Sequence, residues 1–209
     1  MNFTKTHITT ILSALAFIAC SAFAADSPEL VRLRIGTGDP VAGKKHAAIC
    51  TSCHGETGMS VAPGVPNLAG QYSDYILNQI FNFQQGTRAD PSKTQLVMTL
   101  SDRKAINDIS VYFAGQNQMT GASLGNESGK NIYIDKGCIN CHGEFGKGKP
   151  RYNAIFPIIG GQRKEYLVKQ MNDFKTGKRS TDVTEIMVQV VNQLTDLDIE
   201  NVAKYLAAQ

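Results

Sequence analysis

Apolar residues recur at helical spacing through most of this chain. Two stretches, 74–85 and 165–176, carry apolar side chains three and four positions apart, and each is followed by a glycine, which is typical of a helix end. Two further stretches follow Ser101 and Thr195, whose hydroxyl side chains make them predicted N-caps. A shorter one covers 44–49. No alternating run is long enough for a sheet, so the pattern predicts an all-α protein made of small helical domains with long loops.

The sequence also repeats itself. Cys-Thr-Ser-Cys-His at 50–54 recurs as Cys-Ile-Asn-Cys-His at 138–142, and Pro-x-x-x-Gly-Gln at 66–71 recurs at 157–162. The segment 115–129 between the copies is rich in Gly, Ser and Asn and lacks an apolar period, which is typical of a linker. We therefore predict one structural unit used twice.

The repeat divides the chain into a leader, two domains and a linker. We predict a signal peptide at 1–24, domain 1 at 25–116, a linker at 117–128 and domain 2 at 129–209. Domains of about 80–90 residues are near the lower size for independent folding, so a covalently held cofactor would add to their stability.

Residues 1–24 have the pattern of an export signal. Lys5 supplies the positive charge, 8–19 form an apolar stretch, and Ala-Phe-Ala at 22–24 provides the small residues that precede cleavage. The apolar stretch is shorter than a membrane-spanning helix of about 20 residues, so we expect cleavage rather than a membrane anchor. We therefore predict a periplasmic protein; a lipid anchor on Cys20 is the alternative.

Composition and charge exclude several classes of protein. The chain has 209 residues, 42% of them hydrophobic, with 21 Lys and Arg against 18 Asp and Glu, which is ordinary for a globular protein. A net charge of +3 without an arginine-rich run argues against nucleic-acid binding. Domain 1 has 8 basic and 8 acidic residues, whereas domain 2 has 12 and 9. Domain 2 could therefore dock on an acidic partner, with a solvated basic surface as the alternative.

Two Cys-x-x-Cys-His motifs contain four of the five cysteines. Residues three and four apart share one face of a helical turn, so two thiols can bond the two vinyl groups of one porphyrin while the next imidazole reaches the iron. Zinc would need four ligands where each motif offers three, and a redox dithiol needs no histidine. We therefore predict two haem c groups, bound through the cysteines with iron on the histidines, at Cys50, Cys53, His54, Cys138, Cys141 and His142.

Met187 is the predicted sixth ligand of the second iron. It lies 45 residues after His142, in what the pattern predicts to be a loop before the last helix. A core methionine is the usual alternative. Methionine sulfur opposite a histidine raises the reduction potential and suits an electron carrier, whereas an open position permits small-molecule chemistry.

The combination of motifs resembles the two-haem cytochrome c4 family. Besides the two motifs already described, both halves carry a Tyr-x-x-x-Gln helix, Gly-x-Arg and Leu-[Ser/Thr]-Asp, and the resemblance extends from about Gly38 to Gln209. It implies tandem class I cytochrome c domains, each with His/Met iron, in a periplasmic carrier that passes electrons to respiratory oxidases.

The resemblance also implies roles for individual residues. The four motif cysteines would be thioether sites, and His54, His142 and Met187 would be axial ligands. Backbone carbonyls at Pro66 and Pro157 would orient the imidazoles. Six side chains would line the haem edges, with ordinary helix packing as the alternative: Tyr75, Gln79, Arg88, Tyr166, Gln170 and Arg179.

Domain 1 departs from the family pattern at the sixth ligand. In the family the ligand methionine lies about eight residues before the Ser or Thr of Leu-[Ser/Thr]-Asp. Met187 fits this spacing in domain 2, but the same count from Ser101 in domain 1 reaches Lys93. Met98 lies only three residues before Ser101. Three alternatives therefore stay open for the first iron: Met98 on a shifted loop, Lys93, or an open position. Our interpretation takes Met98. Two other methionines are weaker candidates: Met59 and Met119.

We predict one-electron transfer through two haems as the function, with no substrate transformed. The expected partners are redox proteins such as a membrane oxidase or reductase complex, with peripheral membrane association as a further expectation. The alternative is a two-haem redox enzyme of the thiosulfate-oxidising or peroxide-reducing type, with an unusual sixth ligand on the first haem. A dedicated electron-transfer subunit of a larger complex is a third hypothesis, because one fold serves all three roles.

Overall fold

The structure is a computed structural model that describes four segments: 33–121, 125–149, 156–180 and 185–209. The predicted signal peptide at 1–24, with Cys20, lies outside the described residues. Within the described segments, no helix is both long enough and apolar enough to cross a membrane.

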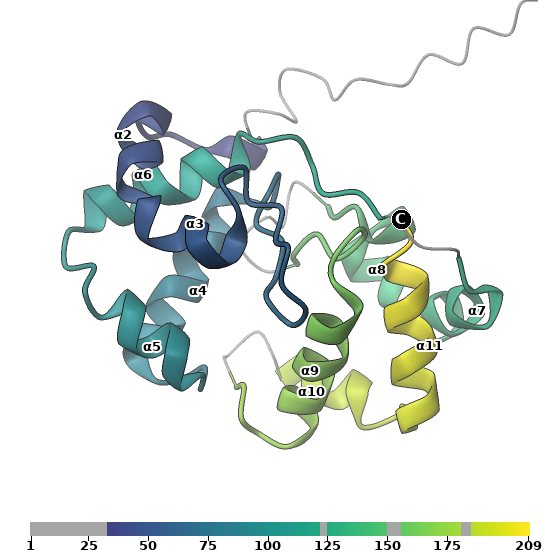
Figure 1. The fold of residues 1–209 in the computed structure, drawn as a ribbon. Helices are drawn as coiled ribbons and strands as arrows, with labels where there is room; N and C mark the ends of the chain where they lie inside the picture. Colours follow the sequence, from purple (N-terminus) through teal and green to yellow (C-terminus); the bar gives the residue numbers. More distant parts are fainter. Residues whose placement is uncertain (1–32, 122–124, 150–155, 181–184) are drawn as a thin grey trace, which may run out of the picture.

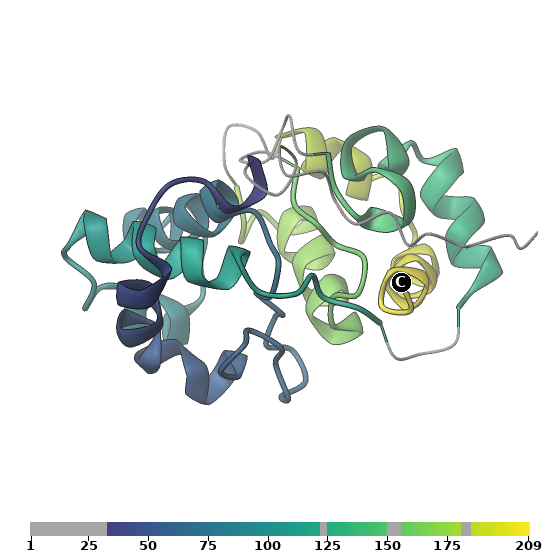
Figure 2. The same ribbon diagram turned by 90° about the horizontal axis from the view of Figure 1, so that it is seen from above.

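Two groups of helices form the two halves of the molecule. Figure 1 shows the purple-to-teal helices α2–α6 on one side and the green-to-yellow helices of the second half on the other, and Figure 2 shows the same separation from above. The first half contains α2 (Pro40–His46), α3 (Ala48–His54), α4 (Ser73–Gln85), α5 (Pro91–Val97) and α6 (Arg103–Ala114). The second half contains α7 (Glu127–Asp135), α8 (Cys138–His142), the 3-10 helix η1 (Glu144–Gly146), α9 (Lys164–Lys175), α10 (Glu185–Val191) and α11 (Asp196–Leu206).

Each half contains the same crossing of two helices. In the first half α2 packs against α6, and in the second half α7 packs against α11. A glycine lies at each crossing: a Cβ on Gly43 would overlap the Asp108 carbonyl, and a Cβ on Gly129 would overlap the Asn201 carbonyl. The missing side chain lets the two backbones approach closely, so the glycines set the crossing.

The predicted fold class is confirmed, because the described residues are helical and contain no strand beyond one isolated bridge. The helices predicted at 74–85 and 165–176 are α4 and α9, each within one residue of the expected limits. Thr195 is the N-cap of α11, with a full capping box. The N-cap predicted at Ser101 is wrong: the side chain of Asp102 accepts from the Lys104 backbone N–H instead.

Two short helices, α5 and α10, were not predicted. Each spans seven residues, too few for an apolar period to stand out. At α5 the sequence signals are local: Asp90 caps the first turn and Pro91 occupies its first position. Met187, expected in a loop, lies in α10.

Reciprocal side-chain bonds join the halves. The Gln71 side chain accepts from the Ile158 backbone N–H at 3.0 Å and donates to the Ile158 carbonyl at 2.8 Å. Gln162 does the same to Asn67, at 2.7 Å and 2.9 Å. Each glutamine is 4% exposed, so these bonds are shielded from water.

The predicted linker is partly fixed to the body of the protein. Met119 is fully buried, packs against Tyr72 and Ile158, and donates its backbone N–H to Ala69. At its other end the linker gives way to α7, which begins at Glu127, inside the segment assigned to the linker. The domain limits 25–116 and 129–209 stay a prediction.

Candidate haem sites

One cavity of about 430 Å³ runs between the two halves. Its walls include His54 and Cys50 from the first half and His142, Cys138 and Cys141 from the second. Cys53 is exposed and is not among the residues that line the cavity. Both predicted attachment motifs therefore open into the same space.

Helix geometry places each motif at this cavity. Each Cys-x-x-Cys-His run lies in a short helix that ends on the histidine: it forms most of α3, which ends at His54, and all of α8, which ends at His142. The next residues, Gly55 and Gly143, have φ of 76° and 75°, a conformation that an L side chain rarely adopts. The chain can thus turn away immediately after each histidine and return as the loop that carries the following proline.

The prolines fix the histidine rings, as the resemblance implied. The Nδ1 atom of His54 lies 2.9 Å from the Pro66 carbonyl oxygen, and Nδ1 of His142 lies 2.9 Å from that of Pro157. A carbonyl oxygen only accepts, so Nδ1 donates its proton and Nε2 keeps a free lone pair. Both rings are less than 9% exposed. The unprotonated nitrogens are those an iron would bind.

Burial favours the neutral form of both histidines and of the first cysteine in each motif. It lowers the pKa of His54 to about 4, with the charge of Lys93 as a second cause, and it lowers the pKa of His142 as well. Burial also raises the pKa of the Cys50 and Cys138 thiols to about 11. The imidazoles are therefore ready to act as ligands, while these thiols resist ionisation.

The arrangement of the candidate ligands fits haem c better than zinc. Throughout the described segments, no three His, Cys, Asp or Glu residues gather closely enough to hold a metal ion, whereas a structural zinc site needs four ligands around one ion. The raised pKa of the Cys50 and Cys138 thiols also disfavours the thiolate that dithiol exchange requires. Thioether bonds to a porphyrin involve no resting thiolate, so the residues present fit haem c.

The walls of the cavity are mostly apolar, as a porphyrin requires. In the first half they include Ile76, Val97 and Phe113, and α10, α11 and the end of α9 supply equivalent side chains in the second half. Many of these residues also belong to the two hydrophobic cores. A haem placed here would extend the core of each half and replace the cavity with packed atoms.

The candidate sixth ligands differ in their position relative to the cavity. Met187 is half-buried on α10 and lines the cavity together with His142. Met98 is 60% exposed at the end of α5 and does not line the cavity, so the structure does not bring it to His54. Lys93 does reach the site, because its Nζ lies 3.3 Å from Nε2 of His54. Met119 is buried where the halves meet and is not among the residues that line the cavity.

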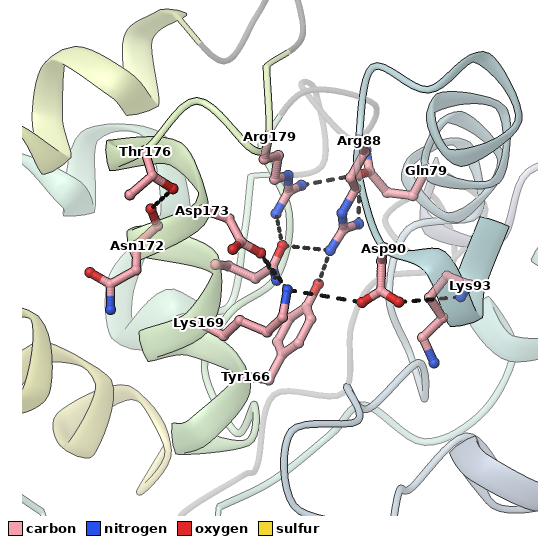
Figure 3. Close-up of polar contacts among 11 residues, drawn as sticks. Gln79, Arg88, Asp90, Lys93, Tyr166, Lys169, Asn172, Asp173, Thr176 and Arg179 are labelled. Atoms are coloured by element: carbon pink, nitrogen blue, oxygen red, sulfur yellow. Dashed lines mark hydrogen bonds and ion pairs between the residues drawn. The ribbon is translucent and has the colours of Figure 1, made fainter.

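The six predicted haem-edge residues all line the cavity and also join the halves. Figure 3 shows four of them, Gln79, Arg88, Tyr166 and Arg179, where the halves meet. Arg88 donates to Tyr166 at 2.6 Å and to Gln170 at 2.6 Å. Arg179 donates to Tyr75 at 2.7 Å and to Gln79 at 3.0 Å. Both expected roles, lining the cavity and packing between helices, are therefore present in the same side chains.

Two residues of the site escaped the sequence analysis. Gln71 and Gln162 were noted only as the ends of a repeated motif, yet both line the cavity and bond across to the other half. Their recurrence directly after a glycine in both halves was the available signal.

The fold and the site define a c-type cytochrome with two haem sites. A family model described as Cytochrome c matches residues 40–108 and 126–209. Cytochrome c4 of Pseudomonas aeruginosa is 35% identical over 85% of this chain and 92% of that protein. The crystal structure of reduced recombinant cytochrome c4 from Pseudomonas stutzeri has a TM-score of 0.75 and 32% identity, and the match covers 82% of this chain and 99% of that one. The thiosulfate dehydrogenase electron acceptor of Thiomonas intermedia is 30% identical over 95% of this chain and 88% of that protein.

The chain therefore belongs to the cytochrome c family and, within it, to the cytochrome c4 proteins. It is a dihaem electron carrier with two covalently bound haem c groups. Below, haem 1 is the group on His54 and haem 2 the group on His142.

Proposed function

We propose that this protein works in the periplasm, where it carries single electrons between components of a respiratory chain and delivers them to a terminal oxidase. The observation that carries the proposal is the shared cavity: the buried histidines of both halves open into one space. When bound, haem iron accepts and releases one electron at a time. An electron received at one haem could then pass to the other without leaving the molecule.

The side chains around the cavity favour repeated electron transfer over bond-making chemistry. The Pro66 and Pro157 carbonyls hold the two imidazoles in one orientation. The reciprocal arginine bonds hold the two halves in one arrangement, because each arginine is only 6% exposed and its guanidinium has partners in both halves. A site that hardly moves and excludes water needs little rearrangement when its charge changes.

The proposal is tested with the purified holoprotein and membranes of the organism that encodes it. The reduced protein is mixed with membranes while haem absorbance and oxygen are recorded. We expect rapid oxidation with matching oxygen uptake, both stopped by cyanide. Membranes that leave the protein reduced, while they still oxidise a small-molecule reductant, would refute the oxidase as acceptor.

A second candidate function rests on the ligand contact of the first half. Lys93 faces His54 where domain 2 offers a methionine, and an unusual ligand is what the enzyme hypothesis requires. A relative is named a thiosulfate dehydrogenase electron acceptor, which suggests thiosulfate as the first compound to test. The holoprotein is mixed with thiosulfate and ferricyanide and no other protein. Steady turnover would support an enzyme; no turnover, but reduction once a thiosulfate-oxidising enzyme is added, would support a carrier.

A further inference from the structure

The two halves place different residues at one equivalent position. Lys93 is the third residue of α5, and Met187 is the third residue of α10. The register continues along both helices, since Val97 and Val191 are both buried and both line the cavity. The helices therefore present their third residues in the same way, and the only change at this position is lysine for methionine.

The geometry brings the lysine amine to the histidine. Nζ of Lys93 lies 3.3 Å from Nε2 of His54, the nitrogen left free by the bond to Pro66. A metal between two nitrogen ligands needs them about 4 Å apart, since each metal–nitrogen bond is about 2 Å long. The observed separation differs from that value by less than the length of one bond, which the flexible lysine side chain can accommodate.

No acidic group competes for this amine within the described segments. Asp90, three residues earlier, accepts from the Lys93 backbone N–H at 3.2 Å, and its other oxygen lies 3.9 Å from Nζ of Lys169. Figure 3 shows the Lys93 side chain leading away from Asp90. Lys93 is half-buried and forms no ion pair in the described part of the chain, so its amine is directed at the haem pocket alone.

The register also explains why Met98 does not reach the site. Met98 corresponds in the repeat to Asn192, which is likewise exposed. Its neighbours Val97 and Leu100 line the cavity instead. To bring Met98 inward, α5 would have to rotate and withdraw Val97 from the core. That rotation would expose a residue now only 9% exposed.

We propose that Nζ of Lys93 is the sixth ligand of the haem 1 iron. Binding forms one iron–nitrogen bond through the amine lone pair; the proton that the ammonium loses passes to solvent, and no electron is transferred. Ligation of the iron by Lys93 requires the two haem c groups but not a particular partner protein. The proposal can therefore be refuted without refuting the proposed function, and the reverse is also true. An amine favours ferric iron more than a thioether does, so haem 1 takes a lower potential than haem 2.

The test begins with the unaltered holoprotein. Near-infrared magnetic circular dichroism of the ferric form separates methionine-bound haem from amine-bound haem. Proton spectra of the ferrous form show one ring-current-shifted methyl signal for each ligand methionine. We expect one methionine-bound and one amine-bound haem, with a single shifted methyl. Two methionine-bound haems, or a haem 1 that binds cyanide as readily as an open site, would overturn the proposal.

Three variants complete the test. Lys93→Met should convert the protein to two methionine-bound haems and raise only the lower of the two potentials. Lys93→Ala should remove the amine signature and let cyanide bind haem 1. Met98→Leu is the matched control and should leave spectra and potentials unchanged. An amine signature that survives Lys93→Ala, or a methionine signature lost in Met98→Leu, would assign the ligand elsewhere.

Discussion

Arg88 and Arg179 form an antiparallel backbone bridge where the two halves meet, and each guanidinium donates to the tyrosine of the opposite half. They occupy the same place in the repeat, so the contact is close to symmetric. Each charge is held by hydroxyl and amide oxygens rather than by a carboxylate. The arginines therefore join the halves through buried hydrogen bonds, and removal of one partner should lower the free energy of unfolding markedly.

Replacing Arg88 tests that interface. Arg88→Met keeps much of the side-chain volume but deprives the Tyr166 hydroxyl and two glutamine oxygens of a charged donor. We expect the free energy of unfolding of the holoprotein to fall by about 3 kcal/mol, measured by urea titration. The control is Arg103→Met, whose exposed guanidinium lies over Phe81 and contributes less than about 1 kcal/mol. Equal losses of unfolding free energy in the two variants would show that the buried network stabilises the protein no more than the exposed contact does.

The helix crossing of the second half depends on Gly129. In Gly129→Ala the new methyl would overlap the Asn201 carbonyl, so α7 must move away from α11. Such overpacking costs about 1–3 kcal/mol. Each kcal/mol lowers the melting temperature of a protein this size by about 2–4 °C. Thermal unfolding followed by circular dichroism measures the shift. Gly125→Ala, where a Cβ meets nothing, should melt like the parent protein, and a shift shared by both variants would contradict the explanation.

The ionisation of Asp108 should make the free energy of unfolding depend on pH. Its carboxylate accepts from the Asp39 backbone N–H and from Lys104, and these bonds hold the pKa of Asp108 below its usual value. A lowered native pKa stabilises the fold above the pKa of the unfolded chain, about 4, and this contribution disappears as pH falls through the native pKa. We therefore expect Asp108→Asn to be less stable than the parent at pH 7, with the difference shrinking below about pH 4. Urea unfolding at several pH values gives the comparison; a difference independent of pH would contradict it.

Met187→Ala tests the second iron. If Met187 is the ligand, its removal takes away the methionine signature of the holoprotein and lowers the potential of one haem, because a thioether favours ferrous iron. A spectroscopic redox titration, with and without cyanide, measures both effects. Met171→Ala is the control, since Met171 also lines the cavity but lies on α9. Loss of the signature in the control instead would transfer the role of ligand to Met171.

Local chemistry made part of this site predictable. A Cys-x-x-Cys-His run indicates haem attachment within five residues. The pairing of His54 with Pro66 was expected only from the resemblance to the cytochrome c4 family, and the hydrogen bond between them agrees with it. The long helices α4 and α9 were predictable for a similar reason: their apolar period runs over three turns.

The rest depends on contacts that no local pattern encodes. Whether Lys93 or Met98 faces the haem is decided by the rotation of a seven-residue helix, which its N-cap and its packing set together. The bond between Gln162 and Asn67 joins residues 95 positions apart, so its partner could not be read from spacing. The wrong N-cap prediction at Ser101 has a simpler cause. The adjacent Asp102 has an equally suitable side chain and is the residue that caps the helix.

The shared cavity also couples the filling of one half to the packing of the other. The arginines that join the halves line the same space as both histidines, so each haem would lie against side chains that hold the interface together. A chain that carried only one haem would therefore have an unfilled wall at this interface, and its two halves would pack less closely than in the holoprotein.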